Sequence, residues 1–146
     1  MRISKKAGYA LKALAIMARK GGSSSIHELS ERENMPVKFL EQILLSLRHA
    51  GLLSSKRGVG GGYTLARAAT EISVLDIIQA LDGPIAPLPC TVDRPAEACT
   101  CPDPRVCPAR ALMTDFRTAM LEWLGAKSLE DLARLMPEAS GLAFDI

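Results

Sequence analysis

Four cysteines, gathered in one short stretch of this 146-residue chain, are the side chains best suited to chemistry. They are Cys90, Cys99, Cys101 and Cys107. In a reducing compartment, grouped thiols bind metals or take part in redox reactions more often than they form a disulfide framework. The N-terminal residues carry no cleavage signal, and no apolar run is as long as a membrane span. We therefore expect a cytoplasmic protein with no membrane partner.

The spacing of the cysteines narrows the chemistry. Successive cysteines are separated by eight, one and five residues, whereas structural zinc sites pair cysteines two to four residues apart. The stretch 84–108 also holds seven of the nine prolines. A long irregular loop in a small protein usually has a function or is disordered. We expect 84–108 to be a sensor loop that holds a metal centre or a thiol switch, for which Cys99 and Cys101 are candidates.

The segment 35–67 predicts a unit that can present side chains to a partner. Pro36 suits the first position of a helix, and Leu40, Ile43, Leu44 and Leu47 follow at helical spacing. Gly51 ends this helix. Two short strands, Leu52–Ser55 and Tyr63–Ala66, then flank a glycine-rich loop, Lys56–Gly62. Helix, strand, loop and strand in this order are typical of a winged helix.

The outer face of that helix carries groups that can contact bases. Lys38, Glu41 and Gln42 lie opposite the apolar stripe, and Gln suits adenine, Glu cytosine, and Lys guanine or phosphate. In the wing, Arg57 supplies charge, and the glycines allow close approach to a phosphate or a minor groove. An ordinary solvated helix face would have similar polarity. The pattern alone leaves both interpretations open.

The charge distribution favours a polyanion partner for the first half of the chain. Residues 1–70 hold 12 Lys and Arg against 4 Asp and Glu, whereas residues 71–146 hold 6 against 12. The basic half is therefore the half with the winged-helix pattern.

Further helices must position these groups. Ser4 can cap a helix to about Lys20, and Ser25 with Glu28 forms a capping-box pattern for a second helix through Glu33. The Asn34-Met35 turn then gives a helix-turn-helix. A helix capped by Ser73 ends at Gly83. We divide the chain into a DNA-binding domain (1–83), the cysteine loop (84–108), a dimerisation helix with a short Ser128-capped helix (109–136), and a loose tail (137–146).

The helix after Pro108 is too apolar to stand alone. One stripe of it contains Leu112, Phe116, Ala119, Met120 and Trp123. A homodimer explains this stripe, because readers of palindromic DNA need a two-fold element. Packing of the stripe onto its own winged helix is the alternative.

Several motifs resemble the Rrf-two family of bacterial winged-helix regulators over about residues 1–135. They are the start Met1-Arg2-Ile3-Ser4 with Gly8-Tyr9-Ala10-Leu11, the helix core Phe39-Leu40-Glu41-Gln42, the wing Arg57-Gly58-Val59-Gly60-Gly61-Gly62-Tyr63, and the cysteine loop leading into Ala111-Leu112. The resemblance implies a mainly α fold with a β-hairpin wing, and a dimeric transcriptional regulator, by expectation a repressor, of double-stranded palindromic operators. The residues expected to contact DNA are Arg2, Ser4, Lys5, Lys38, Glu41, Gln42, Arg57, Gly60, Gly61 and Tyr63.

The resemblance also implies an iron-sulfur cluster, 2Fe-2S or 4Fe-4S, ligated by Cys90, Cys101 and Cys107. The two fourth ligands known in the family are both absent here. Some members have a histidine three residues after the last cysteine, where this chain has Arg110, and others have an aspartate just before the N-terminal tyrosine, where this chain has Gly8. Cys99 is therefore the candidate fourth ligand, with an external small molecule as the alternative.

Other functions stay open beside the cluster sensor. The protein can be a metal-free thiol switch, a regulator that responds to a small molecule, or a redox or metal carrier with an acidic protein partner. An enzyme is not expected, because the sequence has no Ser-His-Asp set, paired carboxylates or nucleotide fingerprint.

Overall fold

The structure is a computed structural model that describes residues 1–92 and 99–138. The parts of the predicted loop and tail at 93–98 and 139–146 lie outside the described residues. The helices and strands are α1 (Lys5–Lys20), α2 (Ile26–Glu33), α3 (Val37–His49), β1 (Leu53–Lys56), β2 (Gly62–Leu65), α4 (Val74–Asp82), α5 (Pro108–Ala126) and α6 (Leu129–Arg134). The predicted fold class, mainly helical with one β-hairpin, is confirmed.

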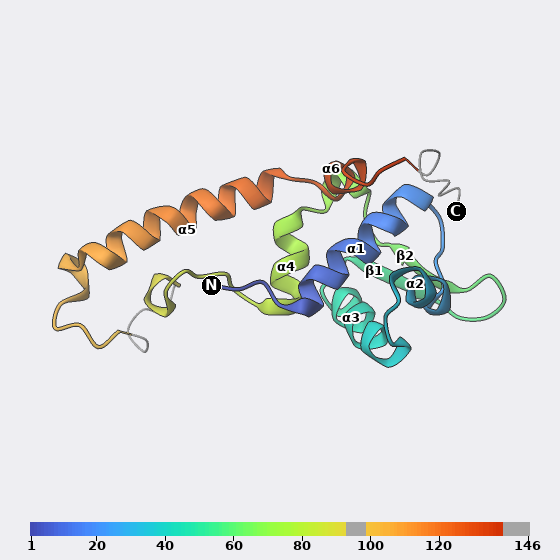
Figure 1. The fold of residues 1–146 in the computed structure, drawn as a ribbon, viewed down its shortest axis with the longest axis horizontal. Helices are drawn as coiled ribbons and strands as arrows, with labels where there is room; N and C mark the ends of the chain where they lie inside the picture. The colour runs from blue at the N-terminus through green and yellow to red at the C-terminus, as the bar shows by residue number, and fades with distance from the viewer. Residues whose placement is uncertain (93–98, 139–146) are drawn as a thin grey trace, which may run out of the picture.

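Helix α1 runs through the middle of the folded unit, with α3 on one side and α4 and α6 on the other (Figure 1). Its inward positions are small or aliphatic, so neighbouring helices approach closely. Leu14 and Met17 are fully buried together with Leu40 and Leu44 of α3 and Ile77 of α4. Each such side chain contributes about 1.5–3 kcal/mol through burial. This core holds α3 with its polar face outward.

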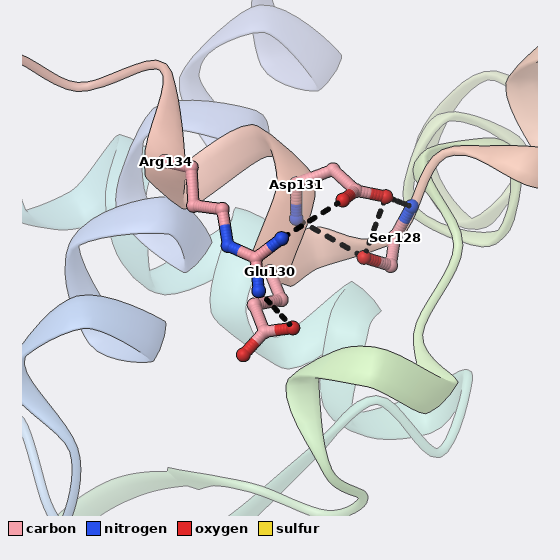
Figure 2. A network of polar contacts seen from close by, with 4 residues as sticks. All are labelled: Ser128, Glu130, Asp131 and Arg134. Carbon is pink, nitrogen blue, oxygen red and sulfur yellow. Dashed lines mark hydrogen bonds and ion pairs between the residues drawn. The ribbon is translucent and has the colours of Figure 1, made fainter.

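Serine caps set the starts of four helices. Ser4 accepts a hydrogen bond from the backbone N–H of Ala7 at 3.1 Å, and Ser73 and Ser128 form reciprocal capping boxes with aspartates three residues later. Figure 2 shows the box at α6, where Asp131 accepts from Ser128 and lies 3.7 Å from a nitrogen of Arg134. These boxes satisfy backbone donors that the helix itself leaves unpaired.

The predicted capping box at α2 is only half right. The N–H of Glu28 donates to Ser25 Oγ at 3.1 Å, as expected. The main partner of the Glu28 carboxylate is Lys20, whose Nζ lies 2.7 Å from Glu28 Oε2. Lys20 and, to a smaller extent, the nearby Ser25 backbone N–H lower the pKa of this carboxyl, but the hydrogen bond returning to Ser25 is not complete.

The hairpin is antiparallel, with Leu53 opposite Leu65 and Lys56 opposite Gly62. Each strand is displaced by one residue from its predicted range, although the N–H of Ala66 still donates to the carbonyl of Leu52 at 3.0 Å. Ser24, just before α2, forms a bridge to Tyr63 through two backbone hydrogen bonds of 2.9 and 2.8 Å. The wing is thereby fastened to the helix-turn-helix.

Helix α5 projects from the folded unit as a long arm, and the chain returns to α1 through α6 (Figure 1). It begins at Pro108, one residue before the predicted domain boundary. One face, with Met120, Leu121 and Leu124, packs on α4. The predicted apolar stripe divides at this point, because Met120 is on the packed face while Phe116 and Trp123 are 48% and 62% exposed.

The stretch after α4 is less irregular than predicted. Two short 3₁₀ turns, Pro89–Thr91 and Pro104–Val106, lie within the described parts of the cysteine loop. The start of the tail is also held, since Arg19 Nη1 donates to the carbonyl of Pro137 at 2.8 Å. The sequence predicts a loose tail from residue 137, but Pro137 itself is held by this hydrogen bond.

Candidate DNA interface and cysteine site

Helix α3 presents the predicted polar face to solvent. Lys38, Glu41 and Gln42 are all exposed, while Leu40, Ile43, Leu44 and Leu47 of the same helix are buried in the core. Asn34 adopts a left-handed conformation, φ 48°, in the turn that separates α2 from α3. This geometry gives a helix-turn-helix whose second helix can enter a major groove.

The wing carries its cation at the start of the loop. Arg57 is exposed, and the N–H of Gly61 donates to the carbonyl of Gly58 at 2.9 Å to close the tip. Gly60 is exposed with φ 73°, whereas a Cβ at Gly61 would collide with the Lys56 carbonyl. Gly61 is thus required by the wing itself, whatever its part in binding DNA.

Tyr63 and the N-terminal residues occupy different surroundings. The Tyr63 side chain is half-buried against the core, and its backbone is bonded to Ser24. Arg2 and Lys5 are exposed. Ser4 is only partly exposed, because its backbone N–H donates to Asp82 Oδ2 at 2.8 Å and its hydroxyl donates to Asp82 Oδ1.

Sequence reasoning missed two apolar residues on the same surface. Val59 is fully exposed at the wing tip, and Val37 lies exposed beside Lys38 in the first turn of α3. Apolar side chains can contact the thymine methyl group or wedge into a minor groove. The sequence signal for Val59 was an apolar residue flanked by glycines in a loop, where it has no core to pack against.

Three of the four thiols gather near the start of α5. The Cys101 thiol interacts with the thiols of Cys99 and Cys107, and Cys107 is the residue that precedes α5. Cys90 lies in the turn Pro89–Thr91, which contacts α5, and its carbonyl accepts from Arg110 Nε at 3.2 Å. Within residues 1–92 and 99–138, no group of three or more His, Cys, Asp or Glu side chains is already arranged to hold a metal ion.

The thiols differ in their tendency to ionise. Hydrogen bonding from Cys99, together with negative charge on Cys99 and Cys107, raises the pKa of Cys101 to about 11. The backbone N–H groups of Arg110 and Ala109 lower the pKa of Cys107. A helix N-terminus stabilises a thiolate, and thiolates are the form that binds metal or attacks a disulfide. Cys107 is therefore more readily ionised than Cys101.

The helix-turn-helix, the hairpin fastened to it and the exposed polar face of α3 define a winged-helix DNA-binding protein. Residues 3–135 match the model of the Rrf2 family, described as an iron-dependent transcriptional regulator. The chain belongs to this family, the Rrf-two family indicated by the sequence motifs. It is a transcriptional regulator, and DNA binding follows from that class.

Relatives and solved structures agree with this assignment. An rrf2-like HTH-type transcriptional regulator of Rhodobacter capsulatus is 38% identical over 89% of this chain and 91% of its own. The regulator IscR of Xenorhabdus nematophila is 35% identical over 92% of this chain and 80% of its own. The structure of CymR, the global cysteine regulator of B. subtilis, has a TM-score of 0.77 at 34% identity and covers 94% of this chain and 99% of its own.

These comparisons confirm that the protein is not an enzyme, since the family consists of regulators. They also favour a regulator over a redox or metal carrier. Among the helices of the described residues, none is long and apolar enough to cross a membrane.

Proposed function

We propose that this protein is a homodimeric repressor in the cytoplasm, binding a palindromic operator with an affinity set by Cys90, Cys99, Cys101 and Cys107. The observation that carries the sensing half is the gathering of Cys99, Cys101 and Cys107 at the start of α5, the helix with an uncovered apolar stripe. A chemical change at these thiols acts where α5 begins. Two such helices packed together would set the spacing of the two DNA-binding units.

The DNA-binding half rests on α3, the wing and the start of α1. Lys38, Glu41 and Gln42 are assigned to the major groove, and Arg57 with Gly60 and Gly61 to the minor groove. Arg2, Ser4, Lys5 and Tyr63 complete the set. The exposure of the α3 side chains and of Arg57 supports this assignment.

The donor set suits an iron-sulfur cluster, because such clusters are held by thiolates and a helix N-terminus favours the thiolate of Cys107. Cys101, Cys107 and Cys99 would hold the group near α5, and Cys90 would join from the turn beside it. Arg110 cannot ligate iron, and it instead holds the carbonyl of Cys90. A bound cluster would supply sensitivity to redox conditions and iron supply.

The chain's own residues then convert the change into geometry. Reordering of the loop would move the start of α5. Met120, Leu121 and Leu124 would pass this movement on to α4, on which they pack. Helix α5 would carry its exposed stripe, including Phe116 and Trp123, with it. A changed angle between paired α5 helices would alter the distance between the two α3 helices.

A thiol switch without metal is the second candidate. The observation in its favour is the unequal ionisation of two interacting thiols, Cys107 and Cys101. Peroxide oxidises one thiolate to a sulfenic acid, and the neighbouring thiolate then attacks that sulfur, so that the S–S bond forms, the S–O bond breaks and hydroxide leaves. Similarity to CymR as well as to IscR accords with either candidate.

The experiment that separates these candidates is a visible spectrum, with iron and sulfide analysis, of protein purified without oxygen. Broad visible absorption together with iron and acid-labile sulfide is expected. Cys99→Ala is expected to lower the bound iron if this thiol is the fourth ligand. A colourless protein free of iron after anaerobic reconstitution would refute the cluster and favour the thiol switch.

The DNA contacts are tested by competition between palindromic and random duplexes. Gln42→Ala is expected to lose about 1–3 kcal/mol of preference for the palindrome, as expected for a base-reading contact. Arg57→Ala is expected to weaken binding to both duplexes and to reduce its salt dependence. Arg134→Ala, a change of the same type on α6, serves as the control. Equal effects of Gln42→Ala on the two duplexes would contradict direct base readout.

A further inference from the structure

Asp82 makes a contact that its own helix does not explain. It is the last residue of α4, where the partial negative charge of the helix end disfavours a carboxylate, and no basic residue in that turn offsets it. Its two oxygens instead accept from the backbone N–H and the hydroxyl of Ser4. Ser4 caps α1, where a negative charge is favoured. The Asp82 carboxylate therefore stabilises the start of α1 by accepting hydrogen bonds from its N-cap residue.

The chain just after Asp82 is held by α5, at Ile85. Gly83, with φ 72°, turns the chain at the end of α4. Ile85 is then buried beside Val74 and Ile78 of α4, and its carbonyl accepts from Arg117 Nε of α5 at 2.8 Å. Ser4 and Arg117 are thus joined through residues 82–85, although they are 113 positions apart in the chain.

The N-terminal residues rest on this segment. Met1, Arg2 and Ile3 line a small hollow of about 130 Å³ together with Ile78, Asp82 and the segment 84–86. Within residues 1–92 and 99–138, the first side-chain hydrogen bonds along the chain are those between Ser4 and Asp82. Arg2 and Lys5 lie on either side of Ser4, so the Ser4 and Asp82 contact holds the backbone between them.

We propose that Asp82 is a positioning residue for the DNA-contacting start of α1, and that Arg117 ties this position to α5 through the Ile85 carbonyl. A displacement of α5 is then passed to Arg2 and Lys5 directly, in addition to any change in dimer spacing. This inference rests on the proposed function, since it assigns a regulatory route to the same DNA interface. The route from α5 to Ser4 is mechanical, because it consists of hydrogen bonds and one short backbone segment.

The first test needs no DNA. Amide hydrogen exchange at Ser4, followed by NMR on the full chain, reports directly on the N–H that Asp82 accepts. Asp82→Ala is expected to speed this exchange about tenfold, as for the loss of a hydrogen bond to a charged group. Arg117→Ala is expected to speed it about threefold from a different helix, whereas Arg117→Lys, which keeps a donor, should change it less.

Asp115→Ala is the matched control, because Asp115 is an exposed residue of α5 two positions from Arg117 and outside this set of contacts. It should leave exchange at Ser4 unchanged. Amide exchange at Leu121 and Leu124, on the face of α5 that packs on α4, verifies that α5 remains docked in every variant. If Arg117→Ala left Ser4 exchange at the wild-type rate while α5 remained docked, the link to α5 would be overturned.

The second test measures affinity for a palindromic duplex selected by the wild-type protein from a random pool. Asp82→Ala and Arg117→Ala are each expected to weaken binding about threefold to tenfold, and the double variant no more than the larger single loss, because the two residues act in one unit. Losses that multiply would overturn the link. Tighter binding by Asp82→Ala would overturn the positioning role and make the carboxylate a competitor of phosphate.

Asp82→Asn separates charge from position. It keeps an acceptor for Ser4 while removing the negative charge, so it should bind DNA more tightly than Asp82→Ala. If the wild-type protein selects no duplex, the proposed function fails, and the exchange measurement still decides whether Ser4 and Arg117 are linked. The two failures are therefore distinguishable.

Discussion

Gly62 is the residue on which the attachment of the wing depends most directly. Its φ of 141° lies where only glycine is comfortable, and a Cβ there would meet the Ser24 carbonyl at 2.6 Å. That carbonyl accepts the N–H of Tyr63, and the N–H of Ser24 donates to Tyr63 in return. Gly62→Ala therefore strains the backbone and pushes apart the two strands of this bridge.

The expected loss of stability combines two terms. A non-glycine residue in this conformation costs about 1–3 kcal/mol. Two backbone hydrogen bonds contribute about 0.5–1.5 kcal/mol each. Together they predict that Gly62→Ala lowers the free energy of unfolding by about 2–6 kcal/mol.

Gly60→Ala provides the matched control within the same loop. Gly60 also has a positive φ, 73°, but a Cβ there meets nothing within 4 Å. Its cost should be the conformational term alone, about 1–2 kcal/mol. Urea unfolding followed by far-UV circular dichroism, at one protein concentration, measures both variants. If the two variants were destabilised equally, the bridge from Ser24 would not fasten the wing.

Three further predictions concern the core, pH and assembly. Leu44→Ala, at a fully buried position of α3, is expected to lower the free energy of unfolding by about 2–5 kcal/mol in urea denaturation. Hydrogen bonds from the backbone and hydroxyl of Ser128 lower the pKa of Asp131. The contribution of Asp131 to the free energy of unfolding is therefore present above its unfolded-state pKa and is lost as the pH falls through its folded-state pKa. Asp131→Asn should flatten the acid side of a plot of unfolding free energy against pH, and an unchanged plot would contradict this. Phe116→Glu is expected to convert a dimer to monomers in sedimentation velocity, and a persistent dimer would exclude the α5 stripe as the interface.

The local signals in the sequence were sufficient for the helices and the hairpin. Ser4 and Ser73 cap the helices expected of them, and the buried residues of α3 are Leu40, Ile43, Leu44 and Leu47, as their spacing predicts. These features depend on residues three or four positions apart, which is the range that periodicity and capping describe.

Contacts between distant segments were not accessible in this way. Glu28 follows the capping-box pattern, yet its carboxylate pairs with Lys20 because the turn after α1 brings the cation within 2.7 Å. Ser4 was assigned to DNA, and its bond to Asp82 depends on how α4 lies against α1. No sequence pattern relates residues 78 positions apart, so these contacts required the fold.

The cysteine site shows the same limit. Clustering in the sequence predicted one site for the four thiols, and in the structure the Cys101 thiol interacts with the thiols of Cys99 and Cys107. The place of Cys107 just before the long helix was expected from the sequence, but the sequence did not show that the backbone N–H groups of Arg110 and Ala109 favour its thiolate. It also did not show Arg110 holding the Cys90 carbonyl.

The central claim, that these thiols set operator affinity, is tested most directly by one binding measurement. Affinity for the selected palindromic duplex is measured for wild type and Cys107→Ala under oxidised, reduced and iron-starved conditions at fixed salt. The account predicts that wild-type affinity changes at least tenfold between conditions, a coupling of about 1.4 kcal/mol, and that Cys107→Ala binds alike in all three. A wild-type affinity that stays constant across the conditions, or a Cys107→Ala response equal to that of wild type, would contradict it.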